Sequence, residues 1–532
     1  MNRFALLILL SCIVNSLIAQ GPAPADYLTR EFHADRRNAL RNSMPANSVV
    51  VVFAYPERVF SADVNYAYHP NPDLYYLSGY KEPGAVLLIF KENQFLGNTS
   101  FNELFYVQKR NALREQWTGR RLGVEGVQNQ LGFKQVFNGE EFKNCPIDFS
   151  KFDKVLYDVF PNDIGTGNLL SLMTTFREKA HIVKTGNKNI ADAYNIIANY
   201  TSYSNLATRV NRLKNNMADA EDVEFKTDPL LLELVNHPDT ANLAAVTKKI
   251  NNNPSPNAAY HKLIAGLREI KTPAELALLR KSVFLSAIAH EEVMKAIEPG
   301  MTETELSGIF EYVHKKYGAE GEGYPPIVGA GGNGCILHYI ENNSTIPGNQ
   351  LVLMDVASEY HGYSADITRT VPANGKFTPE QKAIYELVYN AQEAVFKICK
   401  EGTAFGKLNE TATGVLAEGL LRLGIISDAK DITRYYMHGC SHHMGLDVHD
   451  KNNGSMLKEN MVITVEPGIY VPKGSPCDPK WWDIGVRIED DVIIGKTSCE
   501  NLSAAAPRGI IEIEKTVAKK SVLNDLVLPA LK

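Results

Sequence analysis

Two aspartates near the middle of the chain lie where their carboxylates could act together. Asp355 and Asp366 belong to the segment QLVLMDVASEYHGYSADITRTV, which has an apolar, strand-like arm on each side of EYHG. This pattern predicts a β-hairpin that turns at EYHG. The two aspartates are equally far from the centre of the turn, so their Cβ atoms would face each other at roughly 5 Å. Two anions so close would repel each other unless a cation lay between them, although aspartates that merely face water would need none.

Two glutamates occupy strand-like segments further along the chain. Glu466 lies in MVITVEPGIYV and Glu489 lies in DIGVRIEDDVII. Because side chains alternate along a strand, Arg487 is expected on the same face as Glu489. A buried arginine beside carboxylates would balance their charge and orient a ligand through paired hydrogen bonds. Taken alone, the arrangement could equally be a salt bridge on an edge strand.

Four of the thirteen histidines fall within twelve residues between the aspartate hairpin and the first glutamate segment, in MHGCSHHMGLDVHD. They are His438, His442, His443 and His449, and the glycines among them allow close approach of the backbone. The set indicates a functional site, whereas His443 is expected to be structural and to face solvent. His338 lies in GGNGCILHYIEN, a glycine-rich turn before a strand, and would be unremarkable alone.

Four carboxylates and one imidazole form a hard, anionic set of donors. A structural zinc ion prefers cysteine and histidine. Oxygen-rich ligation suits two divalent ions, Mn²⁺ or Co²⁺ in the first place and Zn²⁺ less. Two ions about 3.5–4 Å apart can share a bridging hydroxide and polarise a carbonyl group. We therefore infer metal-assisted hydrolysis at a site formed by Asp355, Asp366, His442, Glu466 and Glu489.

The elements that must position these residues form two α/β parts. Residues 27–184 alternate apolar strands with helical stretches, which predicts a mixed α/β domain. Residues 185–253 are expected to be a helical insertion that ends in the turn cluster NNNPSPN. Beyond it, Thr272, Pro273 and Glu275 have the pattern of a capping box that begins a long helix. The predicted division is an N-terminal domain at 21–255, a catalytic domain at 256–515 and a tail at 516–532.

Length, charge and the N-terminus limit the classes of function. A chain of 532 residues with a net charge of −6 has no basic footprint, so nucleic acid is not expected as a partner. In the first twenty residues Arg3 precedes a short apolar run, the pattern of a cleaved signal peptide. A membrane anchor or a lipid on Cys12 are the alternatives. We expect an exported protein, periplasmic or extracellular, without stable membrane insertion. The other six cysteines form no CxxC pair, and no disulfide pairing is predicted.

At these motifs the sequence resembles the creatinase-like, pita-bread metallopeptidases, and within them the aminopeptidase P (Xaa-Pro aminopeptidase) group. The five candidate ligands match this family in order and spacing, in MDVASEYHGYSADITRT, HGCSHHMGLDVHD, TVEPGIY and GVRIEDD. The match covers residues 267–514, and HPNPDLYYLSGYKEPGAVLLIF and REQWTGRRLG extend it to the N-terminal part. The resemblance implies an α/β N-terminal domain, a pita-bread catalytic domain and removal of the first residue from peptides with proline second.

The resemblance also implies roles for individual residues. Asp366 and Glu489 would bridge two metal ions, Asp355 would complete one ion, and His442 with Glu466 would complete the other. Glu466 would also be the general base. The other residues that the resemblance implicates are His338 and His449 at the scissile carbonyl and the proline, His438 in support of that pocket, Arg487 and Tyr470 around the metals, and Asp73 and Trp117 from the N-terminal domain. The last two match positions that reach an active site, including across a subunit interface, so a homo-oligomer (dimer or tetramer) is expected.

Related activities remain as alternatives. Prolidase, which cleaves dipeptides that end in proline, shares the fold and the five ligands, but NPDLYYLSGY and the context of Trp117 favour aminopeptidase P. Methionine aminopeptidases generally lack the large N-terminal domain. A metal-free member of the fold, a creatinase-type hydrolase or a binding module, would have lost ligands that this chain keeps. The insertion at 185–253 departs from the smaller members of the group and leaves site access and oligomeric state open.

Overall fold

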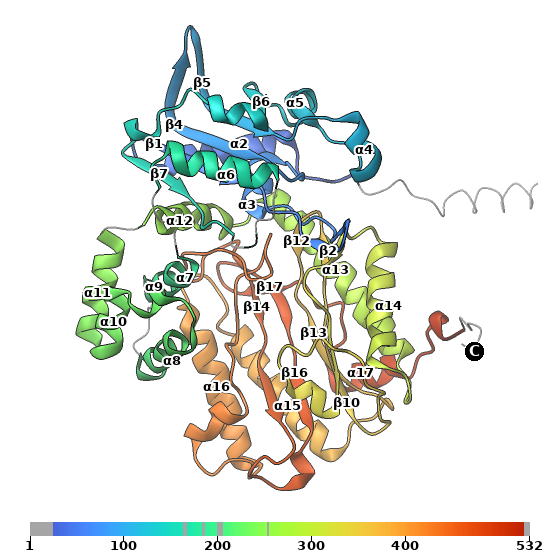
Figure 1. Cartoon of the computed structure of the whole chain (residues 1–532). Helices are drawn as coiled ribbons and strands as arrows, with labels where there is room; N and C mark the ends of the chain where they lie inside the picture. The colour runs from blue at the N-terminus through green and yellow to red at the C-terminus, as the bar shows by residue number, and fades with distance from the viewer. Residues whose placement is uncertain are drawn as a thin grey trace, which may run out of the picture.

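The computed structural model describes residues 25–525, apart from residues 162, 164–166, 183–186, 199–205 and 253–254. The predicted signal peptide at residues 1–20 therefore lies outside the described residues. An N-terminal unit stacks on a larger C-terminal unit, and a helical region flanks the contact between them (Figure 1). None of the helices in the described ranges combines the length and apolar composition that a membrane crossing requires.

A five-stranded sheet with helices on both faces forms the N-terminal unit. Its strand order is β6-β5-β4-β1-β7, with β1 antiparallel to β4 and parallel to β7. Side chains of β1 alternate: Val50 and Val52 share a core with Leu40 of α2, whereas Val49 and Val51 pack with Phe176 of α6. The elements are α2 (Arg30–Ser43), β1 (Ser48–Phe53), α3 (Pro72–Ser78), β4 (Val86–Leu96), β5 (Thr99–Val107), α4 (Ala112–Thr118), β6 (Val136–Asn138), β7 (Lys154–Tyr157) and α6 (Asn168–Lys179).

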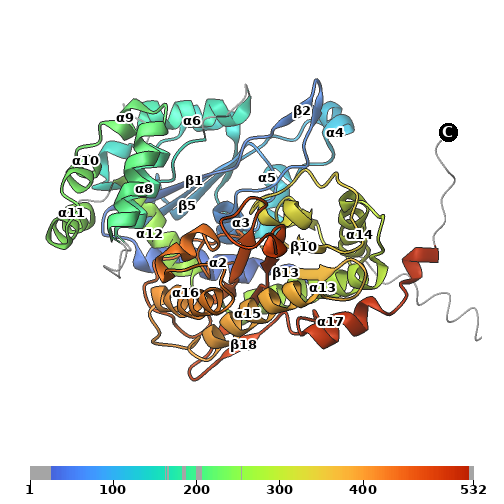
Figure 2. The ribbon, with the colours of Figure 1, turned by 90° about the horizontal axis from the view of Figure 1, so that it is seen from below.

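Helices occupy the segment that the sequence predicts to be a helical insertion. Leu231, Leu234 and Val246 belong to an apolar core that these helices share among themselves. They lie together at one side of the molecule (Figure 2). The helices are α7 (Lys188–Ala198), α8 (Leu206–Asp219), α9 (Val223–Lys226), α10 (Pro229–Asn236) and α11 (Thr240–Asn252). The next helix, α12 (Pro256–Arg268), contacts α2 and β7, so the first element after the proposed division at residue 255 packs on the N-terminal unit.

The C-terminal unit begins with the predicted capping box. Thr272 Oγ1 accepts a hydrogen bond from Glu275 N (3.4 Å), and Glu275 Oε2 accepts one from Thr272 N (2.8 Å). This confirms the predicted start of α13 (Pro273–Ala296). Helix α13 packs on α14 (Glu303–Lys316) and α17 (Ile510–Val517), and α15 (Pro379–Phe396) packs on α16 (Phe405–Arg422).

The candidate residues lie on or beside short strands of the C-terminal unit. They form the sheets β13-β10-β9, β12-β11-β8 and β14-β17-β18 and the pair β15-β16. Strand β16 also contacts β10 and β13, which brings the separate sheets together (Figure 1). The strands are β8 (Gly321–Glu322), β9 (Ile327–Ala330), β10 (Leu351–Asp355), β11 (Ser358–Tyr360), β12 (Tyr363–Ser364), β13 (Thr368–Pro372), β14 (Val462–Val465), β15 (Gly468–Val471), β16 (Ile484–Arg487), β17 (Asp490–Ile494) and β18 (Cys499–Asn501).

The register of the aspartate hairpin differs from the prediction. Tyr360 pairs with Tyr363, and Asp355 pairs with Thr368 rather than with Asp366. The turn is therefore centred between His361 and Gly362, whose φ angles are 53° and 86°. A tight two-residue turn needs positive φ at both central positions, which glycine adopts easily, and this requirement shifts the centre one residue beyond the middle of EYHG.

Helix α13 holds this hairpin at the place where its two sheets meet. The Nε2–H of His290 donates to Val356 O and Ile367 O, both at 3.0 Å. His290 is fully buried, and its Nδ1 has no hydrogen-bond partner among the described residues. Burial, reinforced by the charge of Arg369, lowers the pKa of His290 from 6.5 to about 3. The native protein thus keeps this imidazole neutral at pH values where an unfolded chain would protonate it.

His290 makes stability depend on acid. Between the unfolded pKa of 6.5 and the folded pKa of about 3, His290 binds a proton in the unfolded chain but not in the folded protein. The contribution of neutral His290 to stability is therefore complete above pH 6.5 and is lost as the pH falls below it. From pH 7 to pH 5, the free energy of unfolding should fall by about 2 kcal/mol more in the wild type than in His290→Gln. Urea unfolding followed by tryptophan fluorescence measures it. Exchange of the exposed His237 for Gln is the control, and an equal pH response in wild type and His290→Gln would contradict the assignment.

Candidate active site

The candidate residues line one cavity of about 610 Å³ in the C-terminal unit. The strands deliver the acids at their ends: Asp355 closes β10, Glu466 follows β14, and Glu489 stands between β16 and β17. The predicted site residues on its wall are Asp355, Asp366, His442, Glu466, Glu489, His338, His438, His449 and Arg487. The structure thus brings together all five predicted ligands, which lie more than a hundred residues apart at the extremes.

His442 is the centre of the ligand cluster. Its Nε2 lies 3.3 Å from Asp366 Oδ2 and 3.5 Å from Glu466 Oε1. Its Nδ1 lies 3.1 Å from His443 O, a carbonyl that can only accept, so Nδ1 carries a hydrogen and Nε2 is the atom that can bind a metal once it has lost its proton. Ligand atoms of Asp366, His442 and Glu489 all lie within 4.8 Å of one another. This spacing suits a shared metal site.

Burial sets the charges of the cluster. It raises the pKa of Asp355 and raises that of Glu466 to about 7, with the charge of Asp366 adding to both shifts. Burial and the neighbouring carboxylates raise the pKa of Glu489 well above its ordinary value. Burial disfavours the charged form of His442, but Asp366 and Glu466 outweigh it and raise the pKa to about 9. Divalent cations would relieve the repulsion among these carboxylates, so the donor set fits such ions.

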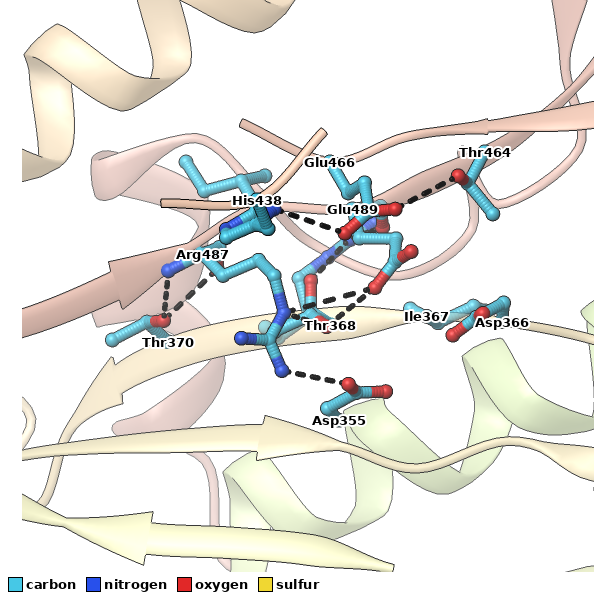
Figure 3. Close-up of polar contacts among 12 residues, drawn as sticks. Asp355, Asp366, Ile367, Thr368, Thr370, His438, Thr464, Glu466, Arg487 and Glu489 are labelled. Carbon is cyan, nitrogen blue, oxygen red and sulfur yellow. Dashed lines mark hydrogen bonds and ion pairs between the residues drawn. The ribbon is translucent and has the colours of Figure 1, made fainter. Parts of the chain in front are cut away.

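Arg487 is the cation that the chain itself supplies. Its Nη2 donates to Asp355 Oδ2 at 2.6 Å, and its Nε donates to Thr368 Oγ1 at 3.0 Å and lies 4.0 Å from Glu489 Oε2 (Figure 3). The arginine and Glu489 side chains are 5% and 2% exposed. The contacts confirm that Arg487 and Glu489 face the same way, and their burial rules out a solvated edge-strand salt bridge.

A hydrogen-bonded chain leads from Arg487 to His438. Arg487 Nη1 donates to the Tyr470 hydroxyl at 2.9 Å, which leaves that hydroxyl to donate to His438 Nε2 at 2.7 Å. His438 Nδ1–H donates to Gly439 O at 2.8 Å. Burial and the charge of Arg487 lower the pKa of His438 to about 4. His438 is therefore a neutral histidine of fixed tautomer, and Tyr470 lies behind it rather than on the cavity wall.

Two more histidines face the cavity. His338 and His449 both line it, and the His449 ring centroid lies 4.3 Å from that of His442 in an edge-on contact. Burial and the adjacent His442 lower the pKa of His449. The apolar side chains of Leu337, Ile340 and Val448 share the wall with them. The polar cluster of candidate ligands thus adjoins an apolar part of the cavity at the two histidines.

Sequence reasoning missed three residues that hold the ligands. The Tyr324 hydroxyl lies 2.5 Å from Asp355 Oδ1 and 2.7 Å from Asp366 Oδ1. Thr368 Oγ1 donates to Glu489 Oε2 at 2.6 Å, and Asp491 Oδ2 accepts from Asp366 N at 2.9 Å. Asp491 follows Glu489 by two positions and Thr368 follows Asp366 by two, so strand alternation could have found both. No comparable pattern marks Tyr324.

His443 is buried, contrary to the expectation that it faces solvent. It is 3% exposed and stacks on Phe405 of α16 at 5.3 Å between ring centroids. Neither ring nitrogen has a hydrogen-bond partner among the described residues. His443 bridges to Ile463 of β14 in antiparallel fashion, so its side chain points away from that of His442 and into the packing between strand and helix.

The structure does not bring Asp73 or Trp117 into the cavity of their own chain. Asp73 is 1% exposed, and its carboxylate accepts from Arg268 Nη1 (2.6 Å), the Tyr260 hydroxyl (2.8 Å) and Lys451 Nζ (2.6 Å). Asp73 is therefore part of a buried ion network between the two units. Trp117 lies on α4 and is 88% exposed.

Comparisons with known proteins agree with this architecture. Residues 277–496 match the description "metallopeptidase family M24", and residues 33–155 match "aminopeptidase P, N-terminal domain". The chain is 32% identical to the Xaa-Pro aminopeptidase of Escherichia coli K12, over 92% of this chain and 97% of the relative. It is 30% identical to Xaa-Pro aminopeptidase 3 of Dictyostelium discoideum, over 92% and 83% of the two chains.

Solved structures show the same fold. Aminopeptidase P from E. coli with the inhibitor Pro-Leu superimposes with a TM-score of 0.71 at 28% identity, over 92% of this chain and 98% of that one. Proline aminopeptidase P II from Yersinia pestis gives 0.70 at 29% identity, over 92% and 100%. Fold and cavity together define a metallopeptidase with an α/β N-terminal domain and a pita-bread catalytic domain, as the sequence predicts. The chain belongs to the aminopeptidase P family, within the M24 metallopeptidases.

Asp73 provides a test of structural against substrate-binding roles. Burial disfavours its charge, but Lys451 and Arg268 hold its pKa well below the usual range. Asp73→Asn removes the anion that Arg268 and Lys451 share in a buried network, so we expect a loss of about 3–5 kcal/mol in the free energy of unfolding. Denaturant unfolding measures it. Glu386→Gln, which breaks an exposed pair with Lys382, should cost less than about 1 kcal/mol. Unchanged stability with a raised KM would instead indicate that Asp73 contacts the substrate.

Proposed function

We propose that this chain removes the N-terminal residue from peptides whose second residue is proline, as a dinuclear-metal aminopeptidase. The observation that carries the proposal is the convergence of Asp355, Asp366, His442, Glu466 and Glu489 in one cavity. The relatives named Xaa-Pro aminopeptidase, which match nearly the whole chain, support the choice of substrate.

The donor set suits two divalent cations, and Mn²⁺ matches it best because oxygen ligands predominate. Asp366 and Glu489 would contact both ions, Asp355 would complete one site, and His442 with Glu466 would complete the other. Two such ions would polarise the scissile carbonyl and lower the pKa of a water molecule. A solved relative is described as Zn-substituted, so Zn²⁺ and Co²⁺ stay as alternatives.

The chain's own residues would supply the proton transfers and the orientation. Burial raises the pKa of Glu466 to about 7, a value at which a carboxylate can take a proton from water and pass it to the leaving proline nitrogen. His449 and His338 stand on the wall where they can contact the scissile carbonyl and the proline ring. Arg487 and Tyr470 hold His438 in one tautomer beside that pocket.

An assay on three peptides separates this activity from its rivals. Manganese-loaded mature protein should release the first residue of Xaa-Pro-Xaa faster than it cleaves Xaa-Pro or Xaa-Ala-Xaa. Preference for the dipeptide would indicate prolidase, and cleavage of none of them would favour a binding module. Glu466→Gln should lower kcat for the proline tripeptide at least about 100-fold, whereas exchange of the exposed Glu459 for Gln should not. Full activity of Glu466→Gln would contradict the assignment of Glu466 as the general base.

The surface around Trp117 suggests that a second copy of the chain completes the site. Trp117 and Leu113 of α4 are 88% and 74% exposed. Phe60 and Tyr66 at the hairpin of β2 (Val59–Ser61) and β3 (Val64–Asn65) are 63% and 57% exposed. Arg121 and Glu57 lie 3.9 Å apart and connect the two regions. Large exposed aromatic side chains of this kind are typical of protein interfaces. We infer a homo-oligomer, dimer or tetramer, in which Trp117 reaches the partner's cavity.

Trp117→Ala tests the shared site. The expected result is a kcat/KM at least about 10-fold lower, because aromatic anchors at interfaces are worth 2 kcal/mol or more, with the metal content of each chain unchanged. Sedimentation velocity with elemental analysis measures state and metal. Leu170→Ala, at a leucine of α6 that is 40% exposed, is the control. A verified monomer with unaltered turnover would exclude a contribution from a neighbour.

We also propose export, on the basis of residues 1–20. Their single arginine, short apolar run and small residues before Gly21 are typical of a cleaved signal peptide. A mature protein that starts at residue 21 or close to it, found outside the cytoplasm by N-terminal sequencing, would support this localisation.

A further inference from the structure

Three cysteines meet beneath the catalytic strands, outside the site described above. Cys399 follows the end of α15, Cys440 lies between His438 and His442, and Cys499 begins β18. Cys399 and Cys440 belong to a buried apolar cluster with residues of β14 and β17, and Cys499 packs against it from the surface side. Cys399 is 0% exposed and Cys499 is half-buried. A reagent in solution can therefore reach Cys499 first.

Cys399 and Cys499 are in direct contact through their thiols. Phe396 O accepts the backbone N–H of Cys399 at 3.3 Å and the S–H of Cys499 at 3.9 Å, so one carbonyl oxygen fixes both residues. The two side chains also hydrogen-bond to each other, sulfur to sulfur. Cys440 differs because its side chain hydrogen-bonds with Tyr436. The pair is thus defined by geometry, although a hundred residues separate its members.

The two thiols have opposite acidity. The S–H of Cys399 donates to the sulfur of Cys499, and this hydrogen bond lowers the pKa of Cys499 while it raises that of Cys399. Burial raises the pKa of each of the other four described cysteines. Thiolates are the attacking species in thiol–disulfide exchange. Cys499 therefore combines access, a lowered pKa and an adjacent second thiol.

We propose that Cys499 and Cys399 form an oxidisable dithiol, in which Cys499 attacks a glutathione-type disulfide and Cys399 resolves the product. In the first step the Cys499 thiolate bonds to one sulfur of oxidised glutathione and expels the other half as a thiolate. That thiolate takes the proton of Cys399, and the Cys399 sulfur then displaces the second glutathione from Cys499. Two protein thiols lose two electrons and two protons, and one oxidised glutathione becomes two reduced molecules.

The resulting disulfide would brace the strands that carry the glutamates. Cys499 pairs with Ile494 of β17, the strand that begins directly after Glu489. Gln392 of α15 donates to Val465 O and Ile488 O, the carbonyls that immediately precede Glu466 and Glu489. A bond between the end of α15 and the start of β18 would therefore tie together two supports of the same cavity. Oxidising compartments, such as the one that export would reach, favour such bonds.

Oxidised glutathione tests the pair in the full-length mature chain. After reaction, free thiols are blocked with iodoacetamide and unreduced peptides are analysed by mass spectrometry. We expect one linked peptide pair that contains Cys399 and Cys499. The midpoint of thermal unfolding should rise by roughly 2–5 °C, because a cross-link over a loop this long restricts the unfolded chain. Dithiothreitol should reverse both effects. A wild type without this linked pair would overturn the proposal.

Single substitutions separate the two roles. Cys399→Ser should stop at a stable glutathione adduct on Cys499, because the resolving thiol is absent. Cys499→Ser, at the half-buried position, should leave Cys399 unmodified. Cys477→Ser is the matched control and should form the linked pair as the wild type does, since Cys477 is also half-buried but contacts Tyr435. An adduct on Cys399 in Cys499→Ser, or faster reaction at Cys477 than at Cys499, would contradict the assigned order.

Discussion

Repulsion among buried carboxylates is the constraint on which the rest of the structure depends. Asp355, Asp366 and Glu489 are each less than a tenth exposed, and with Glu466 they share one cavity. Burial raises the pKa values of Asp355 and Glu489, so burial alone favours the neutral forms of these two acids. The site therefore needs cations, and Arg487, which lies 2.6 Å from Asp355, supplies one positive charge against four carboxylates. Metal ions and a rigid frame of donors must supply the remainder.

The frame consists of donors that hold these carboxylates by hydrogen bonds: both oxygens of Asp355 accept one, whereas Thr368 engages a single oxygen of Glu489. Tyr324 binds one oxygen of both aspartates, and Thr368 binds one oxygen of Glu489. These donors lie on strands or beside them, and strands position side chains more rigidly than loops. The register places Thr368 opposite Asp355. The same short ladder therefore positions Asp355 itself, the hydroxyl of Thr368 that donates to Glu489, and Asp366, which lies two residues before Thr368. A register shift would disrupt all three.

Residue type and spacing predicted which acids and which histidine converge on the cavity, because the patterns lie in short local motifs. Asp355 ends an apolar strand, and Glu466 and Glu489 follow one, and such patterns can be recognised in the sequence alone. The patterns that predicted the fold class and the capped start of α13 were likewise local. Contacts across the chain were not predictable: the turn geometry at His361 and Gly362 set the hairpin register, packing on Phe405 buried His443, and Tyr324 reaches its aspartates from a segment without any pattern. The burial of Asp73 belongs to the same class, since its partners come from three distant segments.

That ion network explains why an N-terminal domain accompanies the catalytic one. Arg268 at the end of α12 binds Asp73 of α3 at 2.6 Å and also Asp447, at 2.7 Å, and Asp450. The last two belong to the segment that carries His449 to the cavity wall. Lys451 closes the circuit, because it binds Asp73 and Asp158 of the N-terminal unit. Buried charges that lose one partner are costly, so the three segments must move together. The position of His449 therefore depends on how the N-terminal unit docks, and changes at that contact would alter the substrate pocket without touching a metal ligand.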